Sequence, residues 1–109
     1  MENNQFILYT TEDGKAAIKL YADNNTIWLN QAQMAELFAT SKQNISLHIK
    51  NILKEGELNA DSVVKEYLTT ANDGKTYNVA YYSLDVILAV GFRVRSARGT
   101  QFRKWANLG

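Results

Sequence analysis

The sequence predicts an α+β fold, and three observations carry this prediction. Two amphipathic helical patterns lie between residues 29 and 54, separated by about four residues. Two strand patterns with a tight-turn signal follow them, and short strand patterns precede them. Two helices joined by a short turn and followed by a hairpin are typical of a winged helix-turn-helix. We therefore expect residues 1–109 to form a single winged helix-turn-helix domain.

The N-terminal residues predict a small antiparallel sheet. Residues 5–10 (QFILYT) are typical of a strand, and the Asp13-Gly14 pair that follows is a strong hairpin signal. Residues 16–21 are expected to return as a second strand, and residues 26–29 to form a short third one.

The first helix is expected to begin after Asn30. Asn30 is a good N-cap residue, and Gln33 has the spacing of a capping box. Met34, Leu37 and Phe38 have the spacing of a buried helical stripe. The helix should therefore pack through one face and end before the next N-cap.

The second helix is expected to start at Thr40 or Ser41. Thr40 with Gln43 again has capping-box spacing, and Gly56 marks the end of the helix. One apolar face repeats at helical intervals and consists of Ile45, Ile49, Ile52 and Leu53. The single histidine, His48, lies at the edge of this face and is expected to be a packed or boundary residue.

The opposite face of the second helix carries side chains that suit the reading of DNA bases. Side-chain amides form two hydrogen bonds with adenine, and lysine donates to guanine. Serine can form a hydrogen bond with either base, and leucine can contact the thymine methyl group. The second helix of a helix-turn-helix lies in the major groove. The alternative is an ordinary solvated helix surface. The candidate base contacts are Ser41, Gln43, Ser46, Leu47 and Lys50.

Basic residues gather in two segments of a chain whose net charge is only +1. Residues 41–54 carry three lysines and no acid, and residues 91–109 carry four arginines and one lysine with no acid. This distribution indicates a positive face, although pairing with acids elsewhere or contacts in a dimer remain open for the arginines. The candidate DNA-backbone contacts are Lys42, Lys54, Thr69, Thr70, Lys75, Arg93, Arg95 and Arg98.

The rest of the chain predicts a wing and C-terminal helices. Residues 62–71 and 75–82 are expected to be strands joined at Asn72-Asp73-Gly74. The threonines near this turn are equally consistent with simple strand propensity. Ser83 is expected to cap a helix that continues to about residue 90, where Gly91 interrupts it, and a last helix is expected over residues 96–106.

No residue pattern favours catalysis. The chain has no cysteine and one histidine, and no glycine-rich phosphate loop follows a strand. We therefore expect no enzyme activity, no cofactor and no metal site. Neither a membrane-spanning stretch nor a signal-peptide pattern is present in the sequence, so a cytoplasmic location without membrane contact is expected.

Several long segments resemble the RhuM-type virulence-associated proteins of bacteria. They are WLNQAQMAELFATSKQNIS, HIKNILKEGEL, SVVKEYLTTANDGKTYNVAYYSLDVILAVGFRV and RGTQFRKWA. The resemblance implies an N-terminal winged-helix module followed by a longer C-terminal effector region, so this chain is expected to be a fragment. It supplies no catalytic residues. Ala39 stands where a helix-turn-helix usually has glycine.

Two functions are consistent with these patterns. The first is sequence-specific binding of double-stranded DNA, in a bacterial transcriptional regulator or virulence-associated protein. The second is a protein-interaction module that docks a partner or a fused effector domain without binding DNA, since a fold does not fix a function. The sequence leaves open whether the chain forms a homodimer.

Overall fold

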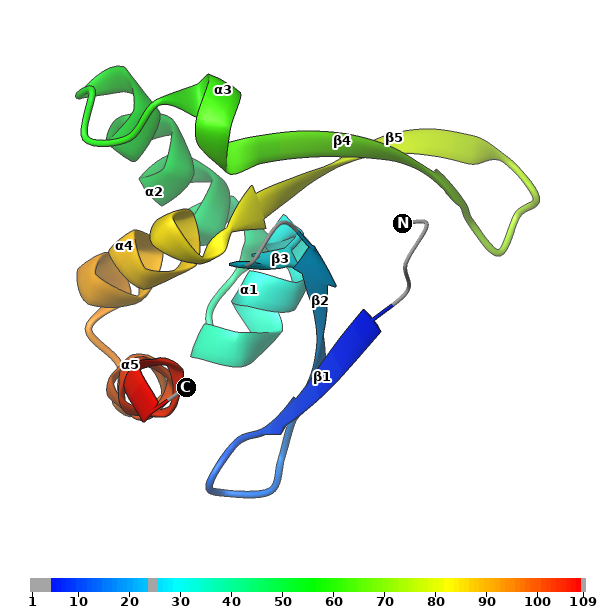
Figure 1. Ribbon diagram of the computed structural model, residues 1–109. Helices are drawn as coiled ribbons and strands as arrows, with labels where there is room; N and C mark the ends of the chain where they lie inside the picture. Colours follow the sequence, from blue (N-terminus) through cyan, green and yellow to red (C-terminus); the bar gives the residue numbers. More distant parts are fainter. Residues whose placement is uncertain (1–4, 24–25, 109) are drawn as a thin grey trace.

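The computed structural model describes residues 5–23 and 26–108. Within these residues, five strands form one sheet that packs with five helices, which confirms the α+β prediction (Figure 1). The elements in chain order are β1 (Gln5–Thr10), β2 (Ala17–Asp23), β3 (Thr26–Leu29), α1 (Gln31–Phe38), α2 (Lys42–Lys54), α3 (Ala60–Val63), β4 (Val64–Thr70), β5 (Thr76–Ser83), α4 (Leu84–Val94) and α5 (Ala97–Leu108).

The N-terminal strands and the predicted wing belong to one antiparallel sheet in the order β1-β2-β3-β5-β4. The expected separation into a small sheet and a hairpin is therefore wrong. The link is the pairing of β3 with β5, which places Trp28 opposite Ser83 and Leu29 opposite Tyr82. The strand before the helix pair is thus hydrogen-bonded to the hairpin that comes after it.

The strand expected from residue 62 starts two residues later. Residues 60–63 form the short helix α3, whose N-cap Asn59 accepts a hydrogen bond from the backbone N–H of Asp61 at 2.9 Å. Val63 closes this turn as a buried residue. The local asparagine cap therefore outweighs the strand propensity of the valines at this position.

The core lies between the helices and one face of the sheet. The predicted stripe of the first helix is buried, and that of the second is buried at Ile45, Ile49 and Ile52, whereas Leu53 is only partly buried. Leu20 and Leu29 supply the inward face of the sheet, and each is fully buried in the same cluster. Burial of a side chain of this size stabilises the fold by roughly 1.5–3 kcal/mol. The helical members of the cluster are Met34, Leu37, Phe38, Ile45, Ile49, Ile52, Val63, Val86, Ile87, Val90 and Phe102.

The other face of the sheet carries a separate aromatic cluster. Tyr81 packs edge-to-face against Tyr21 and Tyr67, with ring centroids 5.5 and 5.6 Å apart. The ammonium group of Lys65 lies 4.6 Å from the ring centroid of Trp28. Trp28 and Tyr81 are buried but do not belong to the main core cluster. Both faces of the central strands are therefore covered by side chains.

The two helices of the pair are fixed by local caps. Asn30 and Gln33 form the predicted capping box at the start of α1. At the start of α2, Ser41 is the N-cap, and its hydroxyl accepts a hydrogen bond from the backbone N–H of Asn44 at 3.0 Å. The expected Thr40–Gln43 box is wrong, because the Thr40 hydroxyl instead accepts from the Asn44 side chain at 2.9 Å.

Gly91 lies inside α4 and does not interrupt it. The helix continues to Val94 and ends where Arg95 takes a left-handed conformation with φ of 55°. A Cβ atom at position 91 would lie 3.0 Å from Cζ of Phe38, so this glycine permits the close approach of α4 and α1. Ser83 occupies the N-cap position of α4, but its side chain makes no capping hydrogen bond, contrary to expectation.

Candidate nucleic-acid interface

All five of the predicted base contacts are exposed: Ser41 as the N-cap of α2, and the other four on the outer face of the helix. Its inner face is held in the core by Ile45, Ile49 and Ile52, which are at most 3% exposed. Leu47, on the outer face, is 54% exposed. The exposed set of Ser41, Gln43, Ser46, Leu47 and Lys50 is hereafter called the α2 face.

The turn between α1 and α2 is short and conformationally defined. Only residues 39–41 separate the two helices. Ala39 has φ of 55°, and the backbone N–H of Thr40 donates to the carbonyl of Ala35 at 2.9 Å. This is the geometry in which glycine commonly ends a helix. The orientation of α2 relative to α1 is thus fixed by backbone bonds as well as by the core.

The N-terminal end of α2 offers a place for an anion. The first N–H groups of a helix have no partner within the helix, and here they belong to Lys42 and Gln43. Lys42 is also exposed and adds a positive charge at the same end. A phosphate oxygen is a suitable ligand for such N–H groups. The Ser41 hydroxyl, in contrast, is already engaged by the backbone of its own helix.

Lys42, Lys50 and Lys54 are all exposed along α2. The acids that follow the helix, Glu55 and Glu57, both accept hydrogen bonds from Arg93, at 2.9 and 3.0 Å. These hydrogen bonds raise the pKa of Arg93 above its usual value. Arg93 therefore neutralises carboxylates close to the C-terminal end of α2 and is less available to a phosphate.

Arg98 is also engaged within the protein. Its guanidinium donates to Asp13 at 3.1 Å and to the backbone carbonyl of Glu36 at 2.8 Å. Its side chain is only 16% exposed. Of the three arginines named as backbone contacts, Arg95 is the exposed one. The sequence could not reveal these partners, because they lie far away along the chain.

The hairpin β4–β5 projects away from the helices, and its tip carries the remaining candidates (Figure 1). Thr69, Thr70 and Lys75 are exposed. Thr69 pairs with Tyr77 and Thr70 with Thr76. Because side chains alternate along a strand, the two threonines point to opposite faces and do not contact one surface together.

The tip also holds a carboxylate that the sequence interpretation left out. Asp73 accepts hydrogen bonds from the backbone N–H of Lys75 and from the Tyr77 hydroxyl, both at 2.9 Å. These bonds hold the pKa of Asp73 below its usual value, the backbone bond being the larger cause. The negative charge next to Lys75 opposes phosphate binding at this point. Lys75 is therefore expected to attract a phosphate less strongly than the lysines of α2.

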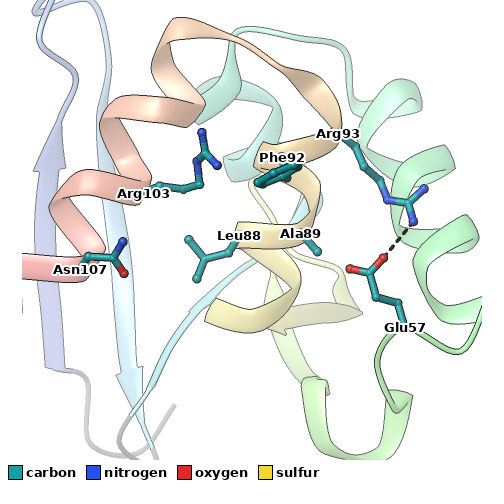
Figure 2. Close-up of a pocket in the computed structure, with 7 residues that line it drawn as sticks. All are labelled: Glu57, Leu88, Ala89, Phe92, Arg93, Arg103 and Asn107. Carbon is teal, nitrogen blue, oxygen red and sulfur yellow. Dashed lines mark hydrogen bonds and ion pairs between the residues drawn. The ribbon is translucent and has the colours of Figure 1, made fainter.

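A groove of about 540 Å³ lies between α4 and α5 (Figure 2). Its apolar wall contains Leu88, Ala89 and Phe92, and Phe92 is 65% exposed. The guanidinium carbon of Arg103 lies 4.8 Å from the Phe92 ring centroid. Arg93 is the one predicted DNA contact among its lining residues. The groove is thus a feature separate from the α2 face.

Across residues 5–23 and 26–108, no three His, Cys, Asp or Glu side chains gather in a way that could hold a metal ion. Within the same ranges, no helix has both the length and the apolar character needed to cross a membrane.

These observations define the chain as an α+β domain with a short-turn helix pair whose second helix exposes a polar and basic face. Residues 62–108 match the model of the Virulence protein RhuM family. The family resemblance inferred from the sequence is thus confirmed over this segment, which covers β4, β5, α4 and α5 and lies outside α1 and α2. No curated protein and no solved structure matches the chain.

Proposed function

We propose that this domain binds double-stranded DNA in a sequence-specific manner and acts as the winged helix-turn-helix module of a RhuM-type bacterial regulator. The observation that carries the proposal is the α2 face. Gln43, Ser46 and Lys50 are exposed together on one helix whose opposite side is fixed in the core. Their amide, hydroxyl and ammonium groups are those that read base edges in the major groove.

The topology supports the winged helix-turn-helix assignment. A strand, two helices and a hairpin follow one another, and β3 pairs with β5, which pairs with β4. This pairing fastens the hairpin beside the helix pair while leaving its tip free to project. A hairpin placed in this way can lie along the DNA backbone when α2 enters the major groove.

The expected salt dependence of DNA binding follows from the number of candidate backbone contacts that are exposed. Lys42, Lys54, Lys75 and Arg95 are exposed, whereas Arg93 and Arg98 are bound to carboxylates. Each neutralised phosphate makes the slope of log affinity against log salt concentration more negative by about 0.9. With four contacts, the slope should be about −3.6.

The direct test is a titration of the domain against mixed genomic duplex DNA at low and high salt, followed by selection of bound sequences from a random duplex pool. The proposal expects binding at low salt and an enriched sequence. The triple variant Gln43→Ala, Ser46→Ala, Lys50→Ala should lose the enrichment. Lys104→Ala, an exposed lysine on α5 outside the α2 face, is the matched control and should retain it. Absence of binding at low salt would overturn the proposal.

A second candidate function is supported by the exposed leucines. Leu47 on α2 and Leu68 on β4 are 54% and 74% exposed, and an interface with a protein partner or a fused effector domain would bury them. This alternative expects no duplex binding. It also expects that Leu47→Lys abolishes partner binding without changing the stability of the domain.

A further inference from the structure

The edge strand β1 has an unusual surface for a free edge. Phe6, Ile7 and Leu8 are 48%, 42% and 63% exposed. The strand pairs with β2 on one side only, and its other side is the end of the sheet as the structure describes it. β1 contains no charged residue and no proline. Natural edge strands usually carry such residues to prevent pairing with another chain.

The other edge of the same sheet provides an internal comparison. β4 has the sequence VKEYLTT, with Lys65 and Glu66 within the strand. Lys65 is bound to Asp23 at 3.3 Å and lies over Trp28. Charged residues are present in β4 and absent from β1, so β1 is the better suited of the two edges to pairing with another strand.

Apolar side chains stand on both faces of β1. Phe6 and Leu8 share one face, where Phe6 lies 4.9 Å from Tyr21 by ring centroids. Ile7 stands on the opposite face together with Tyr9, whose ring packs on Phe102 and Trp105. An added strand would bury apolar side chains on both faces and would also satisfy the free backbone N–H and C=O groups.

We propose that β1 is the interface of a symmetric homodimer, in which the β1 strands of two copies pair antiparallel and join the two sheets into one. The strand is self-complementary, because opposite residues of such a pair share a face: with the two-fold axis at Leu8, Leu8 lies opposite Leu8 of the second copy and Ile7 opposite Tyr9. No like charges oppose each other, because the strand is uncharged. This surface goes beyond the proposed DNA binding and does not depend on it.

A single strand pair is a small interface, so the dimer should be reversible and dependent on concentration. If both copies also bind DNA, neighbouring half-sites would strengthen the association, because the second contact becomes intramolecular. The test is therefore made without DNA, so that failure of the dimer and failure of DNA binding are separate results.

The first measurement is sedimentation equilibrium of the 109-residue protein over a range of micromolar concentrations. We expect a monomer–dimer equilibrium that Leu8→Lys weakens by at least about tenfold. Leu68→Lys is the matched control, because it places the same charge on an exposed leucine of the opposite edge, and it should leave the equilibrium unchanged. A monomeric wild-type protein, or equal effects of the two variants, would overturn the proposal.

The second measurement uses the absence of cysteine from the chain. Directly opposed residues of antiparallel strands have Cα atoms about 4.5–5.5 Å apart, which is within reach of a disulfide. Leu8→Cys, or Ile7→Cys if the two-fold axis passes there, should form a cross-linked dimer under mild oxidation. Leu68→Cys should remain monomeric. The proposal fails if neither β1 variant cross-links beyond the level of this control.

Discussion

The guanidinium of Arg98 donates a hydrogen bond to the Asp13 carboxylate at 3.1 Å, although the two residues are 85 positions apart in sequence. A second bond from the same guanidinium reaches the carbonyl of Glu36, near the C-terminal end of α1. A cation is favourable at that end of a helix. One side chain therefore connects the β1–β2 turn, the first helix and the last helix.

This contact predicts a loss of stability in acid. The Thr11 hydroxyl, the backbone N–H of Lys15 and Arg98 together hold the pKa of Asp13 well below its usual 3.8. A depressed pKa stabilises the folded state above pH 3.8, and this contribution is lost as the pH falls through and below that value. Thermal unfolding from pH 7 to pH 3 should show a smaller pH dependence for Asp13→Asn than for the wild type.

The control for this measurement is Asp61→Asn, because Asp61 is exposed and forms no ion pair within the described ranges. It should follow the wild-type pH profile. An identical profile for Asp13→Asn would show that the Asp13 contacts do not persist in solution.

Gly91→Ala should destabilise the fold by about 1–3 kcal/mol, because the added methyl group overpacks a closed contact. It would lie 3.0 Å from Cζ and 3.1 Å from Cε1 of Phe38, whose ring is 1% exposed. Chemical denaturation measures the change. In the Phe38→Leu background, the same substitution should cost clearly less; additive costs would contradict a direct contact.

Ala39→Gly should stabilise the protein by about 0.5–1 kcal/mol, although glycine usually weakens a helix. Ala39 holds a left-handed conformation with φ of 55°, which is costly for a residue with a Cβ atom. The control is Ala32→Gly, at an exposed position within α1, where a loss of about 1 kcal/mol is expected. Denaturation midpoints that move in the same direction for both variants would refute the argument.

The two N-cap serines should respond differently to alanine. Ser41→Ala should cost about 1 kcal/mol, because its hydroxyl caps α2 at 3.0 Å. Ser83 is 4% exposed, and among the described residues its hydroxyl has no hydrogen-bond partner. Ser83→Ala should therefore be neutral or stabilising, since a buried hydroxyl without a partner is unfavourable. Equal losses in thermal unfolding would contradict this distinction.

DNA variants should separate base reading from phosphate contact. Gln43→Ala on the α2 face should weaken the preferred duplex by about 1–3 kcal/mol and leave unrelated duplexes nearly unchanged. Lys54→Ala should weaken all duplexes alike and reduce the salt slope by about 0.9. Lys75→Ala should act in the same way but less strongly, because Asp73 lies beside it. Fluorescence anisotropy at several salt concentrations distinguishes these outcomes.

Local patterns in the sequence predicted much of the fold. The bounds of β1 and β3, the capping box at Asn30 and the helical stripes, except for the partly buried Leu53, follow from nearby residues and agree with the structure. The prediction that Gly91 interrupts a helix is wrong because helix propensity does not include packing, and the reason for this glycine is its close contact with Phe38 in another helix. The single sheet is not predicted for a similar reason, because the local sequence around Trp28 and Ser83 does not indicate that these two residues are paired.

The candidate site was predictable only in part. Helical periodicity alone separates Gln43 and Lys50 from the core side of α2, and both are exposed. Periodicity does not show which charges are already neutralised. The carboxylate partners of Arg93 and Arg98 come from distant segments, and the carboxylate of Asp73 alters the hairpin tip through side-chain bonds.

The pairing of β3 with β5 bears on how this protein can be divided or recombined. The segment that matches the family model begins after β3 and α1, which pack against it. If residues 62–108 were excised, α4 would lose its contact with Phe38 and β5 would lose its neighbour β3. A chimera that exchanges only the matched segment would inherit mismatched contacts along this seam. Recombination between relatives should therefore not separate residues 26–38 from residues 62–108.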